Sequence, residues 1–148
     1  MAETYSLLQV MVRDHRKIEK LLDTFEEHTK GEYDAMVASF NTFAWELEKH
    51  VFVEEKAIFT AYHPEDVVYG YKMLPELTKQ HNVILNKLEV MRKDIRNRRV
   101  MKDVYGFGEF LRKHRAFEEE HVYPKLDQAL TEQQKKHVID RINEVLSK

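Results

Sequence analysis

Two copies of one short pattern contain the residues that are best suited to bind a metal ion. Residues 49–55 read Lys-His-Val-Phe-Val-Glu-Glu, and residues 113–119 read Lys-His-Arg-Ala-Phe-Glu-Glu. Each copy has one histidine further upstream in the chain, His15 before the first and His81 before the second. Imidazole and carboxylate groups are common protein ligands of iron, manganese and zinc. The repeated pattern therefore predicts a metal site assembled from helices.

Helical geometry separates the two glutamates of each copy. Side chains four residues apart in an α-helix point in directions about 40° apart, so His50 and Glu54 share one face. The second copy repeats this arrangement with His114 and Glu118. The last glutamate of each copy lies about 140° from the histidine, where it is better placed to face solvent or to support a ligand. These flanking residues are Glu55 and Glu119.

Buried charge favours a metal over the alternative, a purely structural polar core. Four histidines fall on the apolar stripes of predicted helices, and two of these stripes add a glutamate. An ionised carboxylate is costly to bury alone, and the stripes place no lysine or arginine near the glutamates. Six ligands exceed the four of a tetrahedral zinc site, but two carboxylates can bridge two metals that each take two histidines. The candidate ligands are His15, His50, Glu54, His81, His114 and Glu118.

The hydrophobic pattern predicts helices throughout the chain. A first helix begins at Ser6, where Ser6 and Gln9 can form a capping box, and ends near Gly31. A second opens around Asp34 and is broken at residues 63–64, His-Pro.

The second half of the chain is predicted in the same way. A loop is expected over residues 64–74, with one possible helical turn around 67–71. The third helix is expected to start near Pro75, and the fourth takes Asp103 as its N-cap. Pro124 is expected to kink or break the fourth helix.

A second capping box, Thr131 with Gln134, predicts a short final helix that is either a partner surface or a cap on the bundle. Long helices with short connections predict an all-α fold, an up-down-up-down antiparallel four-helix bundle with this additional short C-terminal helix. The expected domain is single, residues 1–148, with a bundle core of about 6–130 and a C-terminal helix of about 131–148.

Composition excludes several classes of function. The net charge of −2 gives no basis for binding nucleic acid or an anionic membrane, and the absence of cysteine excludes disulfides and iron–sulfur clusters. Basic residues gather between positions 92 and 99, and cations at a helix C-terminus explain them better than a binding patch. The chain shows neither a signal-peptide pattern at its N-terminus nor a long apolar run. We therefore expect a cytoplasmic protein.

The order of the motifs resembles the hemerythrin-like, or HHE cation-binding, domain family. That order is His, then His-x3-Glu, then His, then His-x3-Glu, and residues 14–18 and 54–59 resemble local phrases of the family. The resemblance spans about residues 6–130 and implies two non-haem iron ions with carboxylate bridges and an oxo or hydroxo bridge. Manganese or zinc is the alternative. One iron would take His15 and His50, the other His81 and His114, and Glu54 and Glu118 would bridge them.

Two departures from the oxygen-carrying hemerythrins affect the expected function. Those carriers have a second histidine four residues after the first in the third helix, where this chain has Leu85, and they end on His-x4-Asp rather than on Glu118 and Glu119. The pattern is closer to the family's sensors, iron handlers and peroxide- or nitric-oxide-reactive members. His121 could also face inward, as a further ligand or as a support for one.

The expected function is a di-iron protein that reacts with or senses O₂ or related small ligands (NO, peroxide), or that handles iron. The alternative is a di-iron enzyme that consumes peroxide or nitric oxide. Turnover needs a proton donor, for which Tyr123, His121 and Glu119 are candidates; Tyr123 is otherwise a packed aromatic residue. The expected partners are a small diatomic ligand or peroxide and an unidentified protein, with no nucleic acid and no membrane.

Overall fold

The computed structural model describes residues 6–58 and 70–147, and all regular structure within them is helical. The prediction of an all-helical protein is confirmed, and no described helix combines the length and apolar character needed to span a membrane. The helices are α1 (Leu7–His28), α2 (Tyr33–Val53), α3 (Gly70–Arg96), α4 (Val104–Phe117), α5 (Tyr123–Ala129) and α6 (Glu132–Leu146).

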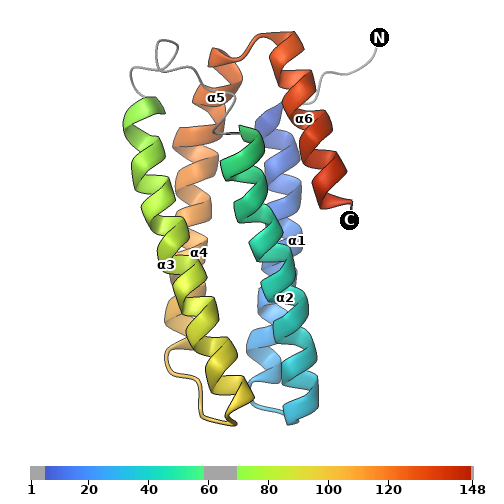
Figure 1. Ribbon diagram of the computed structural model, residues 1–148, viewed down its shortest axis with the longest axis vertical. Coiled ribbons are helices and arrows are strands. Elements are labelled where there is room, and N and C mark those ends of the chain that lie inside the picture. The colour runs from blue at the N-terminus through green and yellow to red at the C-terminus, as the bar shows by residue number, and fades with distance from the viewer. Residues whose placement is uncertain (1–5, 59–69, 148) are drawn as a thin grey trace.

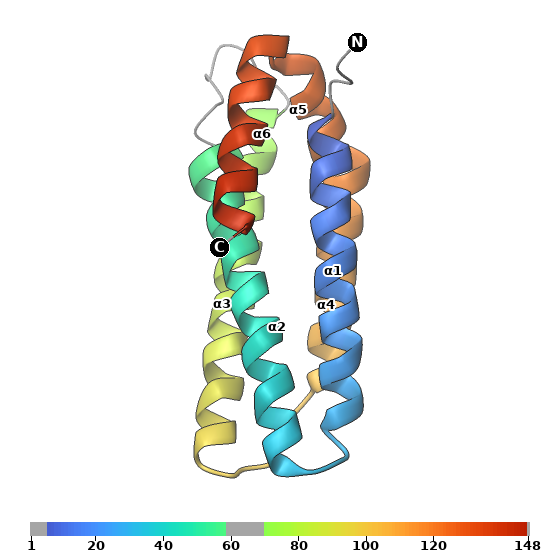
Figure 2. The same ribbon diagram turned by 90° about the vertical axis from the view of Figure 1, so that its right-hand side faces the viewer.

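Four helices lie side by side with their long axes aligned, and two shorter ones cover one end. In Figures 1 and 2, the α1–α2 and α3–α4 connections lie at the same end of the molecule. Helices α5 and α6 lie at the opposite end, where α6 packs along α2 (Figure 2). The start of α1 is fixed at this end, because the backbone N–H groups of Leu7 and Leu8 donate to the carboxylate of Asp127 in α5.

The apolar core consists of two clusters separated by a polar layer. One cluster gathers residues from the α5–α6 end and the other gathers aromatic and aliphatic residues from the far half of the bundle. In each long helix, the predicted histidine stands between a residue of one cluster and a residue of the other. These flanking residues are Met11 and Ile18, Leu47 and Val53, Leu77 and Ile84, and Leu111 and Val122. The histidine layer is therefore enclosed by apolar side chains along the bundle axis.

The predicted helix starts are correct where the side chain makes the cap. Ser6 and Gln9 form a reciprocal capping box at α1, and Thr131 and Gln134 form another at α6. Asp103 is the N-cap of α4, but it has a left-handed backbone (φ 59°) and its carboxylate makes no capping hydrogen bond.

The predicted start of the third helix at Pro75 is wrong, and so is the end of the loop at Leu74. Helix α3 begins at Gly70 and contains Pro75 inside it. Pro75 is the sixth residue of α3 and has no backbone N–H, so the helix continues through this position with one backbone hydrogen bond missing. The expected break at residues 63–64 and most of the expected loop lie outside the described residues.

Each copy of the repeated pattern ends in a π-helical turn. These turns are Glu54–Ile58, which continues α2, and Glu118–Val122, which separates α4 from α5. The second turn ends two residues before Pro124, so the expected break of the helix near that proline is confirmed. π-Helical turns inside α-helices occur frequently at functional sites. Both turns begin at a glutamate that was predicted to bind metal.

Candidate metal centre

The six predicted ligands come together inside the bundle. All six side chains are buried, and Glu54, His81 and Glu118 are fully inaccessible to solvent. They form two groups of four, and within each group the possible ligand atoms lie within 4.8 Å of one another. One group is His15, His50, Glu54 and Glu118, and the other is Glu54, His81, His114 and Glu118. The two glutamates belong to both groups, as bridging carboxylates would.

In the first group, nitrogen and oxygen atoms from three elements meet at short range. The Nε2 atoms of His15 and His50 are 3.1 Å apart. His50 Nε2 lies 2.7 Å from Glu54 Oε1, and His15 Nε2 lies 3.3 Å from Glu118 Oε1. In both histidines, the atom that faces the shared glutamates Glu54 and Glu118 is thus Nε2.

The second group repeats this arrangement with longer contacts. His81 Nε2 lies 3.5 Å from Glu54 Oε1, and His114 Nε2 lies 3.4 Å from Glu118 Oε2. The His81 and His114 rings are close, with centroids 5.1 Å apart. The two groups therefore meet at the same pair of glutamates, with Nε2 atoms on both sides.

Each flanking glutamate supports a histidine of another helix. His15 Nδ1 lies 2.8 Å from Glu119 Oε2, and His81 Nδ1 lies 3.2 Å from Glu55 Oε1. An ionised carboxylate only accepts hydrogen bonds, so the Nδ1–H of each histidine donates. The prediction that these glutamates flank the site as supporting groups is in keeping with this geometry.

The other two histidines are supported by residues that the sequence did not single out. His50 Nδ1 donates to Asp14 Oδ2 at 2.6 Å, and His114 Nδ1 donates to Gln80 Oε1 at 2.5 Å. Asp14 and Gln80 each directly precede an upstream histidine in the sequence. With all four Nδ1 atoms held in this way, the lone pairs of the four Nε2 atoms point into the cluster, which is how outer partners orient metal-binding histidines.

Mutual repulsion separates the protonation states of the two central glutamates. Burial alone would raise the pKa of Glu54, but the charge of His50 and the hydrogen bonds that Glu54 accepts together outweigh it and hold that pKa well below its usual value. Burial and the charge of Glu54 raise the pKa of Glu118 well above its usual value. Two nearby carboxylates do not ionise together without counter-charge. A cation bound between them would supply that counter-charge.

The histidines are also affected by burial. Burial lowers the pKa of His114 to about 4, which keeps this imidazole neutral. Burial acts in the same direction on His50, but the carboxylates of Glu54 and Asp14 overcome it and raise the pKa of His50 to about 10. Because metal ions bind neutral imidazole, a metal would displace the proton that His50 otherwise retains.

The oxygen atoms of Glu118 fit a bound cation. Neither of them receives a hydrogen bond from the described residues, although His15 Nε2 and His114 Nε2 lie only 3.3 and 3.4 Å away. Buried polar atoms are nearly always paired. A cation between the carboxylates and the imidazoles would satisfy these atoms, and the mixed nitrogen and oxygen donors suit iron, manganese or zinc.

Tyr123 and His121, which the sequence suggested as a proton donor and as a further ligand, differ in their distance from the cluster. Tyr123 is fully buried, with its hydroxyl 3.1 Å from Glu54 Oε2 and 3.3 Å from His15 Nε2. The His121 side chain is 55% exposed and lies 3.7 Å from Glu120, outside both groups. The α-helical period suggested an inward His121, but the π-helical turn from Glu118 rotates the chain less per residue and leaves this ring outside.

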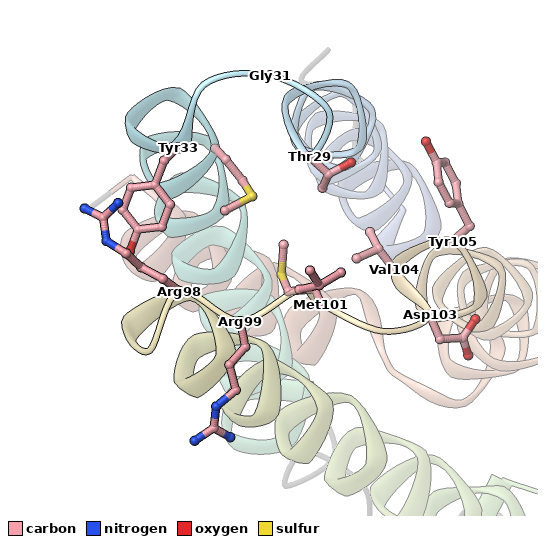
Figure 3. A pocket seen from close by; sticks show the side chains of 11 residues that line it. Thr29, Gly31, Tyr33, Arg98, Arg99, Met101, Asp103, Val104 and Tyr105 are labelled. Carbon is pink, nitrogen blue, oxygen red and sulfur yellow. The ribbon is translucent and has the colours of Figure 1, made fainter.

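A cavity of about 590 Å³ lies away from the metal-ligand candidates, at the opposite end of the bundle from α5 and α6. It opens between the α1–α2 and α3–α4 connections, and Figure 3 shows Tyr33, Arg98 and Met101 around it. The guanidinium of Arg98 stacks 4.1 Å from the centroid of the Tyr33 ring, and Arg99 points away. None of the predicted metal ligands lines this cavity. The basic residues near it follow the C-terminus of α3, as expected for cations that complement a helix dipole.

Comparison with known proteins agrees with the order of the motifs. Residues 6–126 match the hemerythrin HHE cation binding domain, a segment that covers α1 to α4 and the first four of the seven residues of α5. Neither the curated proteins nor the solved structures contain a match to the chain. The matched segment contains all six buried ligand candidates. The chain therefore belongs to the hemerythrin HHE cation-binding domain family.

Proposed function

We propose that this protein binds two non-haem iron ions in a carboxylate-bridged centre within an up-down-up-down four-helix bundle. The observation that carries the proposal is the pair of four-residue groups that share Glu54 and Glu118. His15 and His50 would hold one ion, and the two remaining histidines, His81 and His114, would hold the other. Such an iron pair supplies open coordination positions for a small ligand and can exchange electrons with it.

The chain itself would orient and shield this centre. The four outer acceptors fix the imidazole rings, and the two apolar clusters exclude water along the bundle axis. A cavity of about 30 Å³ lies against the cluster, where aliphatic side chains that include Leu22, Leu47 and Leu111 meet four of the candidate ligands. One water molecule needs about 10–15 Å³ of such space, so the cavity has room for only one or two small molecules. The cavity therefore favours a diatomic ligand or peroxide over a larger substrate.

The function that we infer is reaction with, or sensing of, O₂, NO or peroxide, or the handling of iron. Reversible oxygen carriage is not favoured, because Leu85 stands where the carriers have a further histidine. One observation favours the alternative, an enzyme that consumes peroxide or nitric oxide. A proton-bearing group, the Tyr123 hydroxyl, is buried within the cluster. Turnover would need such a group to deliver protons.

Metal content tests the proposal directly. Protein loaded with ferrous iron under anaerobic conditions should hold two ions per chain, and its absorption spectrum should change on exposure to O₂, NO or peroxide. The His50→Ala variant should lose bound iron, whereas the control His137→Ala, at an exposed position on α6, should retain two ions. Wild-type protein that never binds more than one ion per chain would contradict the paired centre. Repeated loss of added peroxide would favour the enzyme over the sensor.

A further inference from the structure

We propose that Tyr123 is a seventh protein ligand, bound through its phenolate oxygen to the ion that His15 and His50 hold. The inference rests on the proposed paired metal centre. It goes beyond that centre because it assigns a ligand of a different chemical class, and assigns it to only one of the two ions.

The position of the hydroxyl is that of a ligand atom. Tyr123 Oη lies 3.1 Å from Glu54 Oε2 and 3.3 Å from His15 Nε2. Neighbouring ligands that each bind one octahedral ion at about 2.1 Å are separated by about 3 Å. The hydroxyl therefore stands at the spacing of an adjacent ligand from two atoms that are themselves expected to bind the ion. Its contact with His15, rather than with His81 or His114, assigns it to the first group.

The π-helical turn explains how Tyr123 reaches this place. The backbone N–H of Tyr123 donates to the carbonyl of Glu118, five residues earlier, which is the hydrogen bond that defines a π-helix. In an α-helix, residues five apart diverge by about 140°. The wider turn brings Tyr123 onto the same side of the chain as Glu118. A bridging carboxylate and the phenol are thus delivered together.

The surroundings of the hydroxyl suit a ligand better than a mere packing contact. The side chain is completely buried, and two acidic groups and an imidazole face it. Burial and the nearby carboxylates of Glu118 and Glu54 raise the pKa of Tyr123 well above its usual value, so the metal-free protein keeps the phenol protonated. A bound cation reverses this local preference. On binding, the phenol O–H bond breaks, an O–metal bond forms, and the proton is released to the solvent.

The repeat shows that this ligand belongs to one copy only. The residue at the matching place in the first copy is Phe59, which has no hydroxyl and lies outside the described residues. The matching place therefore supplies no phenol for the second group. The two ions would differ in their protein ligands even though the histidines and glutamates are arranged symmetrically.

Spectroscopy of the ferric protein tests the proposal. Phenolate bound to ferric iron gives a charge-transfer band in the visible region, and Raman excitation within that band enhances the vibrations of the bound ring. Wild-type protein should show both, and the vibrations should shift when the protein is made with ring-deuterated tyrosine. The Tyr123→Phe variant should lose the band, while the Tyr105→Phe control, at an exposed position, should retain it.

A second measurement does not depend on colour. Iron uptake by the wild type should release one more proton than uptake by Tyr123→Phe, because only the wild type deprotonates a phenol. Two ions per chain without tyrosine vibrations or the additional proton would overturn the assignment of Tyr123 and leave the paired centre intact. Failure of the wild type to bind two ions would instead contradict the proposed function. If Tyr123→Phe does not fold, the labelled wild-type protein still decides the question.

Discussion

The Nδ1–H groups of His50 and His114 donate to acceptors of different charge. This difference predicts unequal metal affinity at the two proposed metal positions. Asp14 is a buried carboxylate 2.6 Å from His50 Nδ1, whereas Gln80 offers a neutral amide oxygen 2.5 Å from His114 Nδ1. Hydrogen bonds to charged groups are roughly twice as strong as neutral ones, and the charge also makes the imidazole a better donor to a metal. The ion at His15 and His50 should therefore be the more tightly held.

Replacing the charged acceptor by a neutral one, or the neutral acceptor by a charged one, should change the metal affinity by a predictable factor. Loss of an outer partner typically weakens metal binding by about 10- to 100-fold. The Asp14→Asn variant removes the charge but keeps an acceptor oxygen of the same shape, so the lower end applies. We expect about tenfold weaker binding at the His50 position, which corresponds to about 1.4 kcal/mol. Gln80→Glu should strengthen binding at the His114 position by a similar factor.

Competition between the protein and a coloured chelator measures this effect, because it resolves two binding constants per chain. Asp14→Asn should lower the larger constant and leave the smaller one nearly unchanged, and Gln80→Glu should bring the two constants closer together. Asp140→Asn, an exposed substitution on α6, is the control for a change of charge alone. The reasoning would be refuted if Asp14→Asn left both constants unchanged or weakened both equally.

Three further predictions concern protonation, access and stability. Because the folded-state pKa of Glu118 is raised, its contribution to stability is present below about pH 4.5 and is lost as pH rises. Metal-free Glu118→Gln should therefore gain stability relative to wild type between about pH 4 and pH 8, measured by urea unfolding, although it cannot bind two ions. Leu111→Phe should fill the small cavity and slow the reaction with NO in stopped-flow experiments, with two ions retained; an unchanged rate would count against this entry route. Each of the two positions should add about 4 kcal/mol of stability when metal is present at about 1,000 times the Kd of that position. By calorimetry, each filled position should raise the Tm by about 8–16 °C above that of the metal-free protein.

The sequence predicted the residues whose positions follow from the regular α-helix. Each histidine lies three or four residues from apolar residues of its helix, and Glu54 and Glu118 each follow a histidine by four, so these six residues face inward, and the structure brings them together. Asp14 and Gln80 were missed for a physical reason. Each acts across an interface between helices, and the helical period within one segment does not specify which side chain faces a histidine on a neighbouring helix.

Departures from the α-helix account for the other differences. His121 was placed inward on the assumption of an uninterrupted α-helix, and the π-helical turn at Glu118–Val122 directs it outward. The same turn brings Tyr123 to the cluster. Pro124 indicated that the helix would be interrupted there, but it did not indicate that the interruption would be a wider, π-helical turn. Pro75 misled in the opposite sense, because proline is favoured at the first helical position but does not fix it, and α3 extends five residues before Pro75.

The two groups of four candidate ligands are arranged alike, but Asp14 and Tyr123 contact the histidines of only one of them. The charged acceptor Asp14 and the hydroxyl of Tyr123 both contact residues of the group that contains His15 and His50. The other group has the neutral acceptor Gln80, and Leu85 is one turn after its histidine His81. Anionic donors stabilise ferric iron more than ferrous iron, because the added positive charge interacts with them more strongly. Under the proposed assignment, the first position therefore favours a firmly held ferric ion and the second a more weakly held one. A symmetric fold would thus hold two ions of unequal character, with the inequality set by the outer acceptors and by the Tyr123 hydroxyl rather than by the six shared ligand types.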